Sequence, residues 1–140
     1  MSGVLGSLVG GSASVATTWV TQRTLSKREL LREEMHKRET LYGEFISECG
    51  KLLVDALTHT LEKPEKLLAC YALLHRIRLC ASDKVLAEAE HVLMRITEQY
   101  FSTNLTLDEL RDWASLEDAD PLKAFGEACR AELKSMRAQV

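Results

Sequence analysis

Hydrophobic residues recur at three- and four-residue intervals along the middle of the chain, which is the spacing of one face of an α-helix. At 100° per residue, the apolar positions of residues 31–57 gather within roughly 80° of one direction, so this face must pack on other parts of the protein. The face consists of Leu31, Met35, Tyr42, Phe45, Ile46, Cys49, Leu52, Leu53, Ala56 and Leu57. No helix breaker lies between Trp19 and Lys63, and we expect Pro64 to end one long helix.

Two further helices are predicted in the middle of the chain. Residues 65–80 are apolar almost all round, which favours a central position in a helical bundle. Ser82 followed by Asp83 suits the N-terminal cap of the next helix. The apolar stripe of that helix consists of Val85, Leu86, Ala89, Val92, Leu93, Ile96 and Tyr100.

The last part of the chain predicts a short helix and a longer one. Thr106 with Glu109 forms the pattern of a capping box, and Asp120 before Pro121 is a cap followed by a first-turn proline. The stripe of the last helix consists of Leu122, Phe125, Cys129, Leu133 and Met136. We therefore expect an all-α protein whose residues 41–140 form a domain resembling a four-helix bundle.

The N-terminal segment has a different composition. From Ser2 to Gln22 there are 21 residues without a charge, about 31 Å of helix, which matches the thickness of a bilayer core of about 30 Å. Trp19 lies where an aromatic residue would meet the lipid headgroups. The sequence thus predicts a transmembrane anchor over residues 1–22. A cleaved signal peptide would instead carry its basic residues before the apolar stretch.

Cations follow the uncharged stretch at once, at Arg23, Lys27, Arg28 and Arg32. Such a flank remains on the cytoplasmic side, so we expect a single-pass protein of the inner membrane with a cytoplasmic C-terminal domain. Residues 23–40 predict a charged helical stalk that continues the anchor, because oppositely charged side chains lie four residues apart. These pairs are Glu33 with Lys37 and Glu34 with Arg38.

Small residues repeat at four-residue spacing within the expected anchor, at Gly6, Gly10 and Ser14. This spacing allows two helix backbones to approach closely in lipid, so a homo-oligomer formed through the anchor helix is one expectation. The net charge of −3 argues against nucleic acid as a partner. The four cysteines, Cys49, Cys70, Cys80 and Cys129, match no zinc-binding spacing and are interpreted as reduced core thiols.

Candidate chemistry is sparse. Two Glu-x-x-His pairs occur, Glu33 with His36 and Glu88 with His91, but the first lies in the charged stalk and His91 points away from the apolar stripe. No catalytic residue, metal site or cofactor is therefore expected. His75 and Arg78 fall on the most apolar helix and suggest a buried polar site, in which Arg78 pairs with Asp55 or Glu90 or else lines a ligand cleft.

The layout resembles small bacterial proteins with one N-terminal span and a helical cytoplasmic domain. The residues that carry the resemblance are the uncharged start, the Arg- and Glu-rich stalk, Leu41-Tyr42, Phe45-Ile46, Tyr71-Ala72-Leu73, Arg78-Leu79, and Asp120-Pro121-Leu122 with Phe125. This resemblance implies no particular activity.

Three functions follow as hypotheses. The first is a membrane-anchored, non-enzymatic interaction or scaffold module that binds an unknown cytoplasmic protein. The second is a membrane-associated enzyme or small-ligand sensor with a cleft near His75 and Arg78. The third is a membrane-perturbing protein of the holin or toxin type, suggested by the small residues of the expected span.

Overall fold

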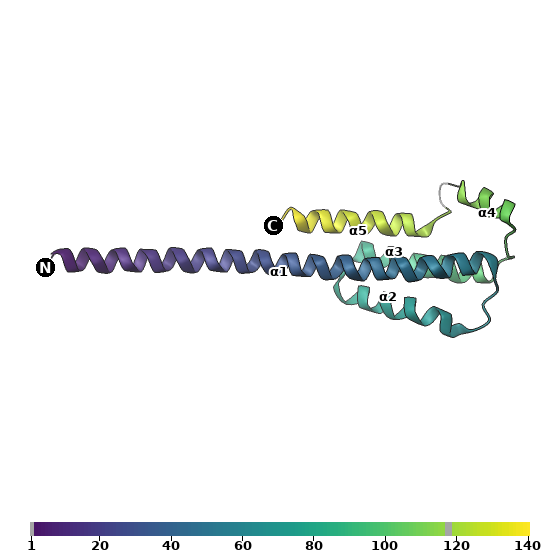
Figure 1. Ribbon diagram of the computed structural model, residues 1–140, viewed down its shortest axis with the longest axis horizontal. Coiled ribbons are helices and arrows are strands. Elements are labelled where there is room, and N and C mark those ends of the chain that lie inside the picture. The colour runs from purple at the N-terminus through teal and green to yellow at the C-terminus, as the bar shows by residue number, and fades with distance from the viewer. Residues whose placement is uncertain (1, 117–118) are drawn as a thin grey trace.

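The computed structural model describes residues 2–116 and 119–140, with side chains from Val15 onward in these ranges. The regular elements are all helical, in the order α1 (Ser2–Thr58), η1 (Pro64–Leu67), α2 (Leu68–Cys80), α3 (Asp83–Tyr100), α4 (Leu107–Ala114) and α5 (Pro121–Arg137). Figure 1 shows α1 as a single rod whose second half lies among α2, α3 and α5, while its N-terminal half projects beyond them. The expectation of an all-α protein with a helical bundle is confirmed.

Helix α1 is continuous over roughly 85 Å at 1.5 Å per residue. It ends at Thr58, earlier than the expected end at Pro64. The last turn is held by local and distant backbone partners: the amide of His59 donates to the carbonyl of Asp55 at 2.8 Å, and the amide of Leu105 donates to the carbonyl of Leu57 at 2.8 Å. The second contact satisfies a carbonyl that a helix end leaves without an intrahelical partner.

The predicted helix starts are confirmed at three positions. The Ser82 hydroxyl accepts a hydrogen bond from the Val85 amide at 3.4 Å. The Thr106 hydroxyl accepts one from the Glu109 amide at 3.3 Å, and the Asp120 carboxylate accepts one from the Leu122 amide at 3.0 Å. Each side chain satisfies an amide that the first turn of a helix leaves free, and so sets where α3, α4 and α5 begin.

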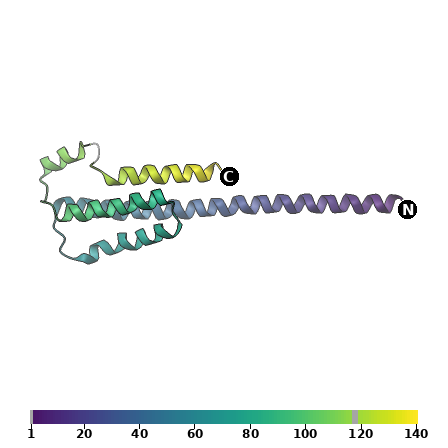
Figure 2. The ribbon, with the colours of Figure 1, turned by 180° about the vertical axis from the view of Figure 1, so that it is seen from behind.

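The packing order of the helices differs from the expectation for residues 65–80. Helices α1 and α3 contact each other and both contact α2 and α5, so α2 and α5 flank a central pair. Figure 2 shows this arrangement from behind. Helix α2 is thus not central: it buries Cys70, Leu73, Leu74 and Ile77, while Leu68, Tyr71 and Leu79 are 63%, 56% and 87% exposed. Its neighbours cover only one face, and apolar composition alone did not determine how many helices would surround it.

The core lies between the central pair and the two flanking helices. Its largest side chains with almost no exposure come from all four helices: Phe45, Phe125, Ile77, Ile96, Val85, Val92, Cys49 and Cys70. The rings of Phe45 on α1 and Phe125 on α5 lie 4.9 Å apart, a tilted arrangement that favours aromatic contact. This contact joins the helices at the two ends of the chain.

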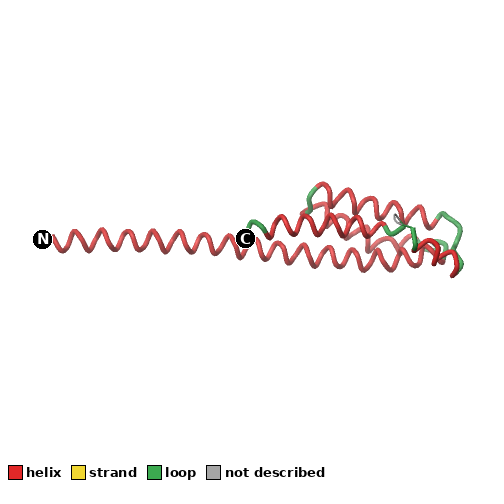
Figure 3. Tube along the Cα trace, turned by 90° about the horizontal axis from the view of Figure 1, so that it is seen from above, coloured by secondary structure: helices red, strands yellow, loops and turns green. Residues whose placement is uncertain are grey.

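The packed part of α1 begins before the expected boundary at residue 41. Met35 is 7% exposed, and the Arg38 side chain reaches α5. By contrast, residues 15–30 are exposed, and Figure 3 shows this part of α1 extending alone past the C-terminus. The stalk expected over residues 23–40 is therefore free only in its first part.

Across the described residues, no helix combines the length and the apolar character needed to cross a bilayer. The expected anchor, residues 1–22, falls largely on residues 1–14, whose side chains lie outside the described part of the chain.

Candidate interaction surface

Glu132 on α5 is the main polar link between helices. The Glu132 side chain is 9% exposed. Its carboxylate accepts hydrogen bonds from Arg38 Nη1 at 2.9 Å, from the Ser82 amide at 2.7 Å and from the Tyr42 hydroxyl. These donors lie on α1 and in the turn between α2 and α3. A nearly buried carboxylate needs such partners, because an unpaired charge away from water is costly. Glu132 thus binds three segments together.

The same cluster shifts the pKa values of its members. Burial, together with the hydrogen bond to Glu132, raises the pKa of Tyr42 far above its ordinary value. Burial by itself would lower the pKa of Arg38. The hydrogen bond with Glu34 and the nearby carboxylate of Glu132 outweigh this effect, so the pKa of Arg38 is raised. Tyr42 therefore remains a neutral donor and Arg38 a cation, which is the arrangement of a structural link.

A second tyrosine–carboxylate pair lies near the C-terminal end of α1. The hydroxyl of Tyr100 on α3 donates to Asp55 Oδ2 at 2.6 Å, and Lys66 Nζ and His59 Nδ1 each lie 3.4 Å from an Asp55 oxygen. The bond from Tyr100 is the largest cause of a lowered pKa at Asp55. Burial raises the pKa of Tyr100 above its ordinary value, and its bond to Asp55 adds to the shift.

The cysteines are core residues, as expected. Cys49, Cys70 and Cys129 are buried and Cys80 is partly buried, all as free thiols. The neighbouring thiol of Cys70 on α2, together with burial, raises the pKa of Cys49 on α1. Burial also raises the pKa of Cys129 to about 12. With raised pKa values, the thiols of Cys49 and Cys129 are protonated at neutral pH and are poor nucleophiles.

The expected buried site at His75 and Arg78 is wrong. Both side chains are exposed, because the buried face of α2 is the one that carries Cys70, Leu73, Leu74 and Ile77. Arg78 forms an ion pair with Glu90 at 3.0 Å, one of the two predicted partners, and the arginine side chain is half exposed. His75 stacks edge-on against Tyr71, with ring centroids 4.5 Å apart. The enzyme or sensor hypothesis thereby loses the buried setting on which it depended.

The Glu-x-x-His pairs remain apart in the fold. His91 lies 4.0 Å from Glu88 on the same helix, and His36 is exposed on α1. Over residues 15–116 and 119–140, no three histidine, cysteine or acidic side chains come together as metal ligands would.

The surface hollows of the bundle are grooves between neighbouring helices. The groove between α1 and α5 has a volume of about 800 Å³, roughly twice that of the others. Grooves of about 410–420 Å³ lie between α3 and α5 and between α1 and α2, and one of about 400 Å³ lies between α2 and α3. Neither His75 nor Arg78 lines any of these four grooves.

Two glycines explain the width of the α1–α5 groove. Gly43 on α1 and Gly126 on α5 both line it, and a Cβ atom added at either position would meet nothing within 4 Å. Glycine inside a helix destabilises it by roughly 0.5–1 kcal/mol relative to alanine. Gly50, further along α1, differs because Leu122 lies 4.0 Å from its Cβ position. The internal packing of the chain does not require a glycine at residue 43 or 126.

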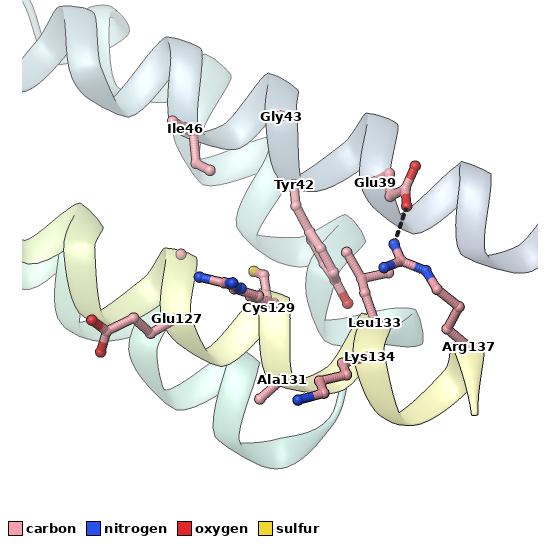
Figure 4. A pocket seen from close by; sticks show the side chains of 12 residues that line it. Glu39, Tyr42, Gly43, Ile46, Glu127, Cys129, Ala131, Leu133, Lys134 and Arg137 are labelled. Atoms are coloured by element: carbon pink, nitrogen blue, oxygen red, sulfur yellow. Dashed lines mark ion pairs between the residues drawn. The ribbon is translucent and has the colours of Figure 1, made fainter. Parts of the chain in front are cut away.

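The outer face of α5 is basic. Its four cations, Lys123, Arg130, Lys134 and Arg137, lie within about 60° of one another and opposite the buried stripe. Arg137 pairs with Glu39 of α1 at 3.5 Å across one end of the groove, as Figure 4 shows. The side chains of Arg130 and Lys134 are exposed and form no ion pair or hydrogen bond with another residue that the structure describes.

The sequence reasoning missed Glu132 and the two glycines. Glu132 shares its helical face with Phe125, Cys129 and Met136, so its position in the apolar stripe was a signal that its carboxylate would be enclosed. Gly43 and Gly126 stand inside predicted helices, where glycine is unfavourable, but only the packing of α1 beside α5 places them in one groove.

No protein-family model, curated protein or solved structure matches this chain.

Proposed function

We propose that the chain is a non-enzymatic interaction module that its N-terminal helix holds at a membrane. The observation that carries this proposal is the projecting part of α1. It presents Val15, Trp19, Val20, Leu25 and Leu30 with exposed fractions of 50–71%, although they belong to a continuous helix. An isolated helix has only marginal stability in water. Surroundings other than this chain are needed to cover these side chains.

A bilayer fits the first part of that helix. Residues 2–22 carry no charge, and Trp19 with Arg23 marks the change to a basic segment. The guanidinium of Arg23 lies 5.5 Å from the centre of the Trp19 ring, a cation–π contact suited to the headgroup layer. Under the positive-inside rule, Arg23, Lys27 and Arg28 orient the bundle toward the cytoplasm, with the span in the inner membrane.

The bundle supplies the interaction surface. The carboxylates of Glu132, which is nearly buried, and of Asp55, which is partly exposed, accept hydrogen bonds from other helices and so stabilise the fold. Molecules that reach the bundle meet its surface grooves, and of the four grooves described above the one between α1 and α5 has the greatest volume. We take a cytoplasmic protein as the partner at this surface.

Self-association through the span is part of the same proposal. The spacing of Gly6, Gly10 and Ser14 supports it, because small residues four apart allow close helix contact in lipid. These three side chains lie outside the described part of the structure.

Cell fractionation tests the anchor. Full-length protein should sediment with membranes and resist extraction by alkaline carbonate, whereas a chain that lacks residues 1–22 should remain in the supernatant. A matched variant in which Arg23, Lys27 and Arg28 become glutamine should still sediment but lose its uniform orientation in a protease-accessibility assay. Complete extraction of the full-length protein by carbonate would contradict the anchor.

A further inference from the structure

The groove between α1 and α5 has the shape of a binding site for another helix. Its walls are antiparallel stretches of α1, from Glu39 to Ile46, and of α5, from Gly126 to Arg137. The α5 wall is roughly 17 Å long at 1.5 Å per residue, about three turns of a helix. Gly43 and Gly126 leave room where a side chain on either wall would fill the groove.

Gly43 and Gly126 indicate what kind of binding partner fits the groove. Glycine inside a helix weakens the fold, and the packing of this chain gives no reason for it at residue 43 or 126. Close approach of another backbone is the usual use of glycine in such a place. Ile46, 38% exposed, and the half-buried Leu133 provide apolar contact beside these glycines.

The charge of the groove rim selects the partner. Arg130 and Lys134 stand one turn apart on α5, exposed and without an ion-pair partner among the described residues. Two carboxylates also line the groove: Glu39 on α1 is paired with Arg137 at 3.5 Å, and the exposed Glu127 on α5 forms no ion pair with Arg130 or Lys134. Acidic side chains spaced by one helical turn would meet the two free cations together.

We propose that this groove binds an α-helix of a partner protein, apolar on one face and acidic along the edge that meets Arg130 and Lys134. This inference rests on the proposed role as an interaction module and names its partner. The partner helix places its apolar face on Ile46 and Leu133, and its backbone approaches Gly43 and Gly126, as in other helix-in-groove complexes.

Lipid and a second copy of this chain fit the groove less well than a helix of a partner protein. The groove begins near Glu39, about 25 Å along the helix from residue 22, which is more than the screening length of about 8 Å at physiological salt. The acidic segment of this chain, residues 98–120, carries seven carboxylates and one cation, but its described residues, 98–116 and 119–120, lie at the end of the bundle opposite to the projecting helix. In two copies anchored in one membrane, the acidic segment of one copy would lie at a different distance from the bilayer than the groove of the other, so the two would not meet.

Peptide binding to the full-length protein in detergent micelles tests the proposal. The probe is a labelled synthetic helix of about 18 residues, with leucine and alanine on one face and glutamate along both edges. A matched peptide carries lysine in place of each glutamate. Fluorescence anisotropy should show saturable binding of the acidic peptide and binding of the lysine peptide weaker by at least about tenfold.

Variants of the groove complete the test. Gly126→Leu should weaken the binding of the acidic peptide at least about tenfold, because the leucine side chain fills the groove. The double change Arg130→Glu with Lys134→Glu should reverse the preference between the two peptides. Lys123→Glu is the control for each single charge reversal, Arg130→Glu or Lys134→Glu, since it changes the net charge by the same amount on the same helix but lies outside this groove. Its effect should remain within about twofold.

Three results would overturn the proposal: no binding of the acidic peptide, binding that Gly126→Leu leaves unchanged, or an equal loss with Lys123→Glu. Arg130 and Lys134 are exposed, so their variants remain informative even where Gly126→Leu disturbs folding. Carbonate extraction of the same proteins separates the two proposals. If the unsubstituted protein resists carbonate extraction but does not bind the acidic peptide, the groove proposal is contradicted. If it binds the peptide but is extracted by carbonate, the anchor proposal is contradicted.

Discussion

The hydroxyl of Tyr42 on α1 donates a hydrogen bond to the carboxylate of Glu132 on α5, and so joins residues 90 positions apart in the sequence. The same carboxylate accepts from Arg38, which makes it the meeting point of the first and last helices. Helix α5 is the final element of the bundle, so this link closes the fold. Its strength should control whether α5 remains docked.

Replacing Glu132 by alanine should therefore destabilise the protein by about 3 kcal/mol, because it leaves Arg38 partly buried without its interhelix carboxylate. Tyr42→Phe removes one hydrogen bond and preserves the ring, so its effect should be about 1 kcal/mol. Urea unfolding followed by circular dichroism measures both. Equal effects of the two variants would show that Glu132 does not hold the cluster together.

Asp55 should make the stability of the fold sensitive to acid. Its pKa is lowered from the ordinary value of 3.8, chiefly by the bond from Tyr100. The unfolded chain therefore takes up a proton at a higher pH than the folded chain. The stabilisation from Asp55 is present above pH 3.8 and decreases as the pH falls through the lower pKa of the folded state. Asp55→Asn should be less stable than the parent at neutral pH, and the difference should shrink below about pH 4.

The measurement for Asp55 is the free energy of unfolding at several pH values. Glu44→Gln is a useful control, because this carboxylate forms an exposed ion pair with Arg76 and should contribute little. A difference between Asp55→Asn and the parent that remains constant from pH 7 to pH 3 would contradict the assignment.

Alanine at Gly43 or Gly126 should stabilise the bundle by about 0.5–1 kcal/mol, because the added methyl group meets no neighbour and the unfolded chain loses freedom. Gly50→Ala provides the comparison, since Leu122 already lies 4.0 Å from its Cβ position. Thermal unfolding measures all three. Destabilisation at residue 43 or 126 would mean that internal packing, and not a partner, requires glycine there.

The thiols should differ in reactivity in the native protein. Cys80 is the one that is partly exposed, whereas Cys49, Cys70 and Cys129 are buried. A disulfide reagent such as 5,5′-dithiobis(2-nitrobenzoic acid) at pH 8 should modify Cys80 first, and the others only at the rate of unfolding. Cys80→Ala should remove the fast phase. A fast phase that persists in this variant would show that a buried thiol is accessible.

Gly10→Leu should weaken dimers of the full-length protein in micelles at least about fivefold if the small residues of the span form the contact. Val9→Leu, at the neighbouring position, should leave the dimer unchanged. Crosslinking at several protein-to-detergent ratios measures the equilibrium. Equal dimerisation of parent and Gly10→Leu proteins would contradict the contact.

The sequence by itself determined the secondary structure and most of the core. Ser82, Thr106 and Asp120 fix helix starts through contacts within three residues, and periodic residues such as Phe45, Val92 and Phe125 form the buried faces. These features depend on local hydrogen bonds and on the helical repeat, so the printed sequence reveals them.

The tertiary structure decided everything that depends on which helices are neighbours. It placed α2 at the edge and so exposed His75 and Arg78, enclosed Glu132 between Arg38 and Tyr42, and brought Gly43 beside α5. Helical periodicity shows that a face must be covered but not which face will cover it. That choice is made by the fit of side chains from segments far apart in the chain.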